Sequence, residues 1–145
     1  MSLDGAYDDG NIFARIVRGE IPAAKVFENA ETLAFMDVFP QVRGHTLVIS
    51  KTSRARNLLE IEPAALSAVM ATVQRVSQAV RLALKPDGIL ISQFNGTAAG
   101  QTIFHLHVHI LPRWYGVELG RHGAGGMAEV TELTTLAALI AERII

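Results

Sequence analysis

The segment Ile103-Phe104-His105-Leu106-His107-Val108-His109-Ile110-Leu111 places three of the chain's five histidines in five residues, at strict alternation. In a β-strand, successive side chains point to opposite faces, and the rise is about 3.4 Å per residue. The three imidazoles are therefore predicted to share one face, while Leu106, Val108 and Ile110 face a core. Because three adjacent histidines contribute little to packing, their clustering predicts a chemical role.

Four further segments have the composition of strands. They are short apolar runs, and Asn29, Pro40 and Gly44 separate the first three of them, as expected for the turns of a meander. With the histidine segment they predict five strands. The four segments are Lys25–Glu28, Leu33–Asp37, His45–Ile49 and Ile89–Phe94.

Three other segments have helical periodicity. From Pro63 to Lys85, apolar residues recur at spacings of three and four, which predicts a long central helix with Pro63 in its first turn. Residues 12–17 predict a short helix capped by Asp9 or Asn11, and residues 131–144 predict a last helical segment. Strands and helices together predict an α+β fold.

The length and composition fit one domain. A chain of 145 residues with 50% hydrophobic residues buries roughly two thirds of its unfolded surface, enough for a core of its own. We expect a flexible tail over residues 1–10, the domain over residues 11–115, and a Gly-rich linker with a final helix over residues 116–145. Because cysteine is absent, disulfide scaffolds and thiolate zinc sites are excluded.

Charge and hydropathy limit the partners. The formal net charge of −1 argues against a broad surface for nucleic acid or for an anionic membrane. The sequence has no run of 18 apolar residues and no basic start followed by an apolar stretch, so neither a membrane span nor a secretory signal is predicted. We therefore expect a cytoplasmic protein.

Three interpretations of the histidine cluster compete: a metal site, a nucleophilic or acid–base site, and a surface strand that happens to be rich in histidine. Alternate histidines on a strand can converge on one ion, with His45 or His122 as a third ligand. The histidine pattern alone leaves the metal site and the nucleophile as open alternatives.

The loop before the histidines favours the nucleophile. Residues 95–102 have the sequence Asn-Gly-Thr-Ala-Ala-Gly-Gln-Thr. Glycines let backbone amides approach a ligand, and amide and hydroxyl side chains donate hydrogen bonds, so this loop suits a phosphate group. Imidazole is a competent nucleophile toward phosphorus because its neutral form exists at pH 7. The two adjacent segments together predict chemistry at phosphorus.

Residues 100–113, Gly-Gln-Thr-Ile-Phe-His-Leu-His-Val-His-Ile-Leu-Pro-Arg, resemble the signature of the histidine triad family of nucleotide hydrolases and transferases. The resemblance extends back through Gly44–Ile49, Phe35–Val38 and Ile12–Ile16, so it covers about Asn11 to Arg113. It is closest to the branch of small nucleotide-binding proteins that hydrolyse purine nucleoside phosphoramidates.

This resemblance implies a five-stranded antiparallel sheet and a homodimer. It implies that His107 attacks the α-phosphorus of a purine nucleotide, such as an AMP conjugate, and forms a covalent nucleotidyl-histidine that water releases. His105, His109 and His45 would support the nucleophile through hydrogen bonds, and no cofactor is implied. We expect His122 to be a loop histidine in solvent rather than part of this site.

The resemblance also implies a nucleotide site. Thr102 matches a hydroxyl that can bond the leaving group, and Asp37 matches a carboxylate that accepts from both ribose hydroxyls. The phosphate loop is matched by Gly100 and Gln101, with Asn95 as a further candidate. The apolar base pocket is matched by Ile12, Phe13, Ile16, Phe35, Val38 and Leu47.

Two positions depart from the family pattern. Phe94 stands where relatives commonly carry Asn or Gln that can reach the phosphate or the leaving group, which leaves leaving-group preference and rate open. Some bacterial relatives bind zinc through Cys residues near the amino terminus, but residues 12–17 have none, so we predict no metal site.

The sequence therefore predicts an enzyme that cleaves nucleoside phosphoramidates or related nucleotide conjugates. Hydrolysis of dinucleoside polyphosphates by the same chemistry is one alternative. A nucleotide-binding regulatory protein with incidental turnover is another, and a His-ligated metal protein is a third.

Overall fold

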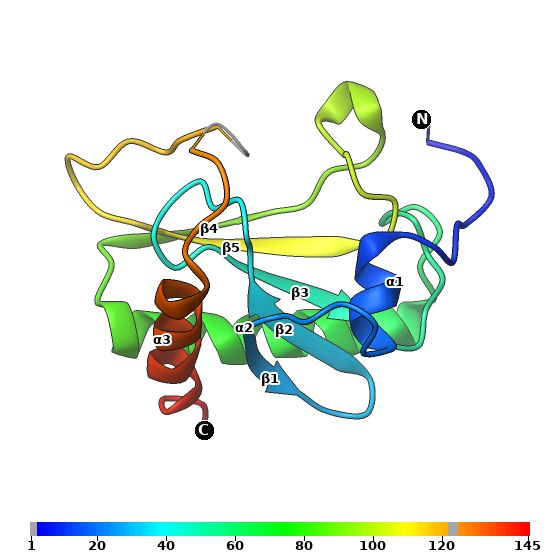
Figure 1. Cartoon of the computed structure of the whole chain (residues 1–145). Helices are drawn as coiled ribbons and strands as arrows, with labels where there is room; N and C mark the ends of the chain where they lie inside the picture. The colour runs from blue at the N-terminus through cyan, green and yellow to red at the C-terminus, as the bar shows by residue number, and fades with distance from the viewer. Residues whose placement is uncertain (1–2, 122–124) are drawn as a thin grey trace.

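The computed structural model describes residues 3–121 and 125–145 and has an α+β fold (Figure 1). A five-stranded antiparallel sheet has the order β1-β2-β3-β5-β4. The predicted fold class is confirmed. The strands are β1 (Lys25–Glu28), β2 (Thr32–Met36), β3 (Thr46–Ser50), β4 (Gly88–Ser92) and β5 (His107–Arg113). The helices are α1 (Ile12–Val17), α2 (Pro63–Leu84), α3 (Val130–Ala141) and the short 3-10 helix η1 (Thr97–Ala99).

Local sequence signals set the helix ends. Asn11 caps α1, because its side-chain oxygen accepts a hydrogen bond from the Ala14 amide at 2.9 Å. Pro63 occupies the first turn of α2, where no intrahelical amide is needed, and Lys85 ends the helix in the left-handed conformation, at φ 51°. Both ends of α2 therefore agree with the sequence prediction to within a residue.

Alternation along the strands divides the sheet into two faces. One face packs against α2 and α3 through side chains such as Val48, Val108 and Ile110, which form the larger core. The other face packs against α1. Its buried apolar cluster consists of Phe13, Ile16, Leu33, Phe35, Leu47 and Ile49.

The start of β5 differs from the prediction more than any other strand boundary does. β5 begins at His107, so His105 lies before the strand rather than within it. The register of β3 against β5 ends where Ile49 opposes His107, and the amide of Leu106 instead donates to the carbonyl of Ala55 at 3.0 Å. The chain thus turns away from the ladder just before the second histidine.

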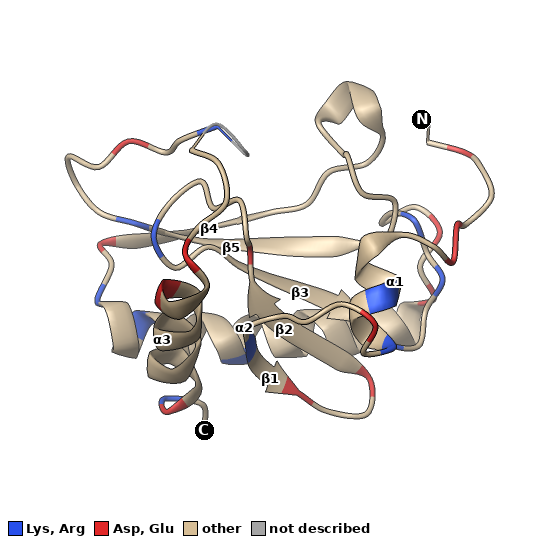
Figure 2. Ribbon diagram, in the orientation of Figure 1, with Lys and Arg blue, Asp and Glu red and all other residues tan. Residues whose placement is uncertain are grey.

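Figure 2 shows that charged residues lie mostly in loops and helices, while β3 carries none. No helix within residues 3–121 and 125–145 is long and apolar enough to span a membrane. The predicted cytoplasmic location remains a prediction.

Candidate active site

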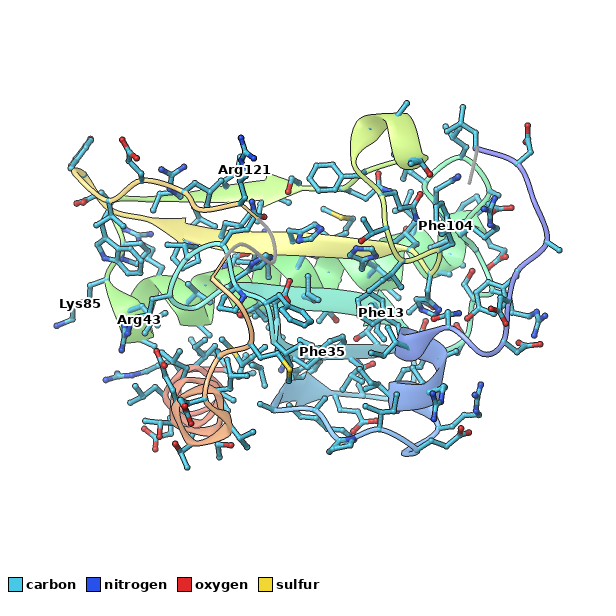
Figure 3. The ribbon with its side chains drawn as sticks, turned by 45° about the horizontal axis from the view of Figure 1, so that its top comes forward. Phe13, Phe35, Arg43, Lys85, Phe104 and Arg121 are labelled. Carbon is cyan, nitrogen blue, oxygen red and sulfur yellow. The ribbon has the colours of Figure 1, made fainter. Side chains whose placement is uncertain are left out.

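The triad histidines lie on the α1 side of the sheet: His107 and His109 point to this face, and the ring of His105, before the strand, meets the ring of Phe13 edge-on at 6.3 Å. His107 and His109 alternate with Val108, which packs into the core on the opposite face, and both histidines are buried. The ring of Phe13, from α1, meets the ring of His107 edge-on at a centroid distance of 4.9 Å. Figure 3 shows Phe13 and Phe35 lying close together on this side of the sheet. The nucleophile candidate is therefore at the edge of an apolar cluster.

The hydrogen bond of His107 defines its tautomer. Nδ1 of His107 lies 2.7 Å from the carbonyl oxygen of His105. A carbonyl oxygen only accepts, so Nδ1 must carry the hydrogen in the neutral ring. The lone pair is then on Nε2, which is the arrangement that a nucleophilic imidazole needs.

One series of hydrogen bonds, the His45 arm, connects His109 to His45. The amide of Gln41 donates to Nδ1 of His45 at 3.1 Å, so the hydrogen of that ring is on Nε2. Nε2 of His45 in turn lies 2.9 Å from Nδ1 of His109 and donates to it. His109 therefore carries its own hydrogen on Nε2, and its ring centroid is 5.0 Å from that of His107.

His105 belongs to a separate arm. Its Nε2 lies 3.0 Å from the carbonyl oxygen of Ser50 and must donate to it, which leaves Nδ1 as an acceptor. The hydroxyl of Tyr7 lies 2.7 Å from that Nδ1. The other histidines thus form two arms beside His107: one joins His45 and His109, and the other holds His105, whose carbonyl bonds Nδ1 of His107. Their support of the nucleophile remains a prediction.

Burial of the ring lowers the pKa of His105 to about 4. The bond to the Ser50 carbonyl opposes this change by favouring the charged ring, and positive charge on His107 adds to the lowering. His105 is consequently neutral at pH 7. The unfolded chain takes up a proton at this position near pH 6.5, before the folded protein does.

We expect this difference to destabilise the protein in mild acid. Neutral His105 contributes its full share to the free energy of unfolding above about pH 6.5. This contribution, about 3 kcal/mol, is lost as the pH falls to about 4. The variant His105→Gln can still donate to the Ser50 carbonyl but does not titrate, so its free energy of unfolding should fall less over this range. Urea unfolding of both proteins between pH 4 and 7 measures the difference. Parallel curves for the two proteins would contradict the assignment to His105.

Asp37 is buried beside the His45 arm. One carboxylate oxygen accepts from the Phe39 amide at 2.8 Å, and the other lies 3.5 Å from Nε2 of His45. The carboxylate thus stabilises the turn after β2 and faces the histidine network. Its predicted role with ribose hydroxyls remains a prediction.

The predicted phosphate loop is held in shape by Gln101. The side chain is buried: its oxygen accepts from the Gly96 amide at 2.8 Å, and its nitrogen donates to the carbonyls of Arg56 and Ile103 at 2.7 and 3.0 Å. The backbone amides of Gly100 and Gln101 also bond within the loop. Gln101 therefore shapes the loop, and Thr102 is exposed at its end.

Asn95 has structural partners as well. Its side-chain oxygen accepts from the Leu58 amide and from the side chain of Gln93, both at 2.9 Å. The neighbouring Phe94 is half-buried, and its ring lies 5.2 Å from that of His109 at an interplanar angle of 44°. Phe94, not Asn95, therefore contacts the triad.

The predicted base-pocket residues differ in their packing, and their role remains a prediction. Phe13, Ile16, Phe35 and Leu47 belong to the cluster on the α1 face, beside His107. Val38 packs against the other core, and Ile12 is exposed at the start of α1. His122 lies outside the described residues.

Asp37, His45 and His109 bring three potential metal donors within 4.8 Å of one another. Two of these donors, Nε2 of His45 and Nδ1 of His109, already share a hydrogen bond. The hydrogen bond and a metal ion are therefore alternatives at the same atoms. The absence of a metal requirement remains a prediction.

Comparison with known proteins agrees with this arrangement. A family model described as the HIT domain matches residues 18–115. The chain belongs to the HIT family. A HIT-like protein of Bartonella henselae, described as involved in cell-cycle regulation, has a crystal structure that matches this HIT protein with a TM-score of 0.88 and 42% identity. The match covers 96% of this chain and all of that one.

Two relatives of this HIT protein are named as enzymes. The adenosine 5'-monophosphoramidase hnt1 of Schizosaccharomyces pombe is 36% identical over 112 residues, which are 75% of this chain and 80% of the relative. The adenylylsulfatase HINT3 of Arabidopsis thaliana is 35% identical over 130 residues, which are 86% of this chain and 66% of the relative. This HIT protein therefore has hydrolases among its relatives.

The sequence did not predict that Tyr7 contacts the triad, through His105. It lies 98 positions before His105, in a segment expected to be a flexible tail. The only local signal is an aromatic residue in an otherwise acidic and glycine-containing stretch, which does not indicate a partner.

Proposed function

We propose that this HIT protein is a hydrolase or transferase that cleaves purine nucleoside phosphoramidates, or related AMP conjugates, at the α-phosphorus. The proposal is carried by the tautomer of His107: Nδ1–H bonds the carbonyl of His105, so the lone pair on Nε2 is the attacking one. Homology to an adenosine monophosphoramidase and to an adenylylsulfatase supports a nucleotide with a variable leaving group.

The reaction has two steps. Nε2 of His107 forms a bond to the α-phosphorus, the phosphorus–nitrogen bond breaks, and the amine leaves with the bonding pair and takes up a proton. Water then attacks phosphorus and gives up a proton to solvent, the bond to Nε2 breaks with its electron pair returning to that nitrogen, and AMP leaves. The Nε2–H of His109 is suited to donate to a phosphate oxygen, because its Nδ1 accepts from His45.

A comparison of substrates tests the proposal. Adenosine 5'-phosphoramidate, adenosine 5'-phosphosulfate and diadenosine polyphosphate are each incubated with the protein in EDTA and, separately, with added zinc. We expect turnover in EDTA, fastest with the phosphoramidate, and a trapped nucleotidyl-histidine adduct. Preference for the dinucleotide favours the polyphosphate hydrolase. Tight AMP binding without turnover favours a regulatory protein, and dependence on zinc favours a metal site.

The tilted contact of the Phe94 ring with the His109 ring motivates a prediction about rate. We expect Phe94→Asn to raise turnover several-fold with little change in AMP affinity, because an amide next to His109 can donate to an oxygen that gains charge in the transition state. Phe94→Leu, which is apolar, is the matched control and should gain nothing. Steady-state kinetics and the melting temperature are measured together. A large fall in melting temperature without a gain in rate would mean that Phe94 serves only packing.

We also propose that two copies pair through β4. This strand is at the edge of the sheet, and its Leu90 and Ile91 are 41% and 40% exposed. An unpaired edge with exposed apolar side chains favours pairing with another strand, and a second β4 would extend the sheet. Light scattering should give twice the mass of the chain, and a monomeric mass contradicts this proposal.

A further inference from the structure

The amino-terminal segment, residues 3–9, is fixed to the body of the protein at both ends. The carbonyl of Leu3 accepts from Nη1 of Arg56 at 3.3 Å, and that arginine is 1% exposed. At the other end, the carboxylate of Asp9 forms an ion pair with Arg54. The segment thus runs along one end of the sheet and into α1 (Figure 1).

Tyr7 lies between these two anchors and meets His105. The guanidinium carbon of Arg54 lies 4.8 Å from the centre of the tyrosine ring. The ring of Tyr7 is also 5.8 Å from that of His105, and its hydroxyl lies 2.7 Å from Nδ1. Since Nε2–H of His105 is used on the Ser50 carbonyl, the tyrosine hydroxyl is the donor of this bond.

His105 in turn holds the atom that orients His107. Its ring is tied to the Ser50 carbonyl, at the point where the ladder between β3 and β5 has ended. Its own carbonyl accepts from Nδ1–H of His107 at 2.7 Å. A continuous series of hydrogen bonds and covalent links therefore connects Tyr7 to the nucleophile.

We propose that Tyr7 is a positioning residue for His107. Together with the Ser50 carbonyl, its hydroxyl holds the neutral Nε2–H ring of His105 in place, and His105 thereby presents its carbonyl to Nδ1–H of His107. Without the hydroxyl, Nδ1 of the buried His105 ring loses the donor that Tyr7 supplies. The lost hydrogen bond lowers the free-energy cost of rotating the ring or of moving its hydrogen to Nδ1. The kinetic part of this inference rests on the proposed function, whereas the tautomer of His105 does not.

The variant Tyr7→Phe tests the hydroxyl alone, because the ring that stacks against Arg54 remains. Tyr115→Phe is the matched control: Tyr115 is 90% exposed, and the hydrogen bond that it makes to Asp87 comes from its backbone amide. Both variants should keep the melting temperature of the parent within a few degrees.

The first measurement is the nitrogen spectrum of the histidine rings in ¹⁵N-labelled protein. In Tyr7→Phe, the Nδ1 resonance of His105 should move toward the position of a nitrogen without a donor, and the His107 resonances should show a smaller fraction of the Nδ1–H tautomer. Tyr115→Phe should leave both rings unchanged. This spectrum needs no substrate, so it tests the inference even if phosphoramidates are not turned over.

The second measurement is steady-state hydrolysis of adenosine 5'-phosphoramidate. We expect Tyr7→Phe to lower kcat about five- to tenfold, the usual effect of one lost hydrogen bond, with KM within about twofold of the parent. Unchanged kcat, or an unchanged His105 spectrum, overturns the positioning role. Loss of activity in the parent protein itself would instead reject the proposed function.

Discussion

Replacing His107 by alanine should lower turnover of an adenosine phosphoramidate at least roughly a thousandfold while AMP still binds. The reason is that the variant loses the nitrogen that forms the bond to phosphorus, but keeps the apolar cluster around Phe13 and the loop that precedes β5. Single-turnover kinetics and calorimetric titration with AMP measure the two effects separately.

His107→Asn provides the matched control for this prediction. Its side-chain amide can still donate to the carbonyl of His105, as Nδ1–H does, but it cannot act as the nucleophile. We expect it to be as inactive as the alanine variant and closer to the parent in stability. Substantial activity in either variant, or failure to trap an adduct on the parent protein, would show that another group attacks phosphorus.

Gly44→Ala should destabilise the protein by about 3 kcal/mol, or about 10 °C in melting temperature. Gly44 has φ +89°, and an added Cβ would lie 2.5 Å from Cδ1 of Leu84 and 3.0 Å from Cγ of Pro112. Leu84 is the last residue of α2 and Pro112 is in β5, so the methyl group would force apart two elements of the core.

Gly19→Ala separates the two causes of this loss. Gly19 has a similar backbone conformation, φ +77°, but an added Cβ would have no atom within 4 Å. It should therefore cost only about 1 kcal/mol, the cost of the left-handed conformation alone. Chemical unfolding measures both variants, and equal losses would show that the contact with Leu84 and Pro112 is easily relieved.

Much of the fold was predictable because its signals are local. The spacing of apolar residues and the position of Pro63 are sufficient to locate α2, and Asn11 caps α1 as the sequence indicates. Strand alternation also predicts that His107 and His109 share a face opposite Val108. These features depend on residues within a few positions of one another, which periodicity can detect.

Features that depend on distant segments were not predictable. His105 leaves the strand because Leu106 bonds the carbonyl of Ala55, a partner some fifty positions away in the sequence. The contact of Tyr7 with His105 likewise has no local signature. In each case tertiary packing brings two residues into contact that lie far apart in the sequence.

The packing of individual apolar residues was also not predictable from the sequence. Resemblance predicts that Val38 and Phe35 line one base pocket, and the structure shows Val38 partly buried against the larger core and Phe35 buried in the cluster on the α1 face. Similarly, Met70 and Leu82 fit the helical spacing of α2 and yet are 43% and 47% exposed. Apolar character alone does not say which of several surfaces a side chain meets.

The central position of β5 determines when the site can exist during folding. β5 is the last strand along the chain, yet it inserts between β3 and β4, with Thr46 opposite Ile110. Such non-local pairing closes a long loop and is slow, and the inner edge of β3 stays open until it happens. A nascent chain that has not reached β5 therefore lacks His107 and His109 of the candidate site. A nucleotide that binds across β3 and β5 recognises only the completed sheet, so it should slow unfolding and protect the protein from aggregation.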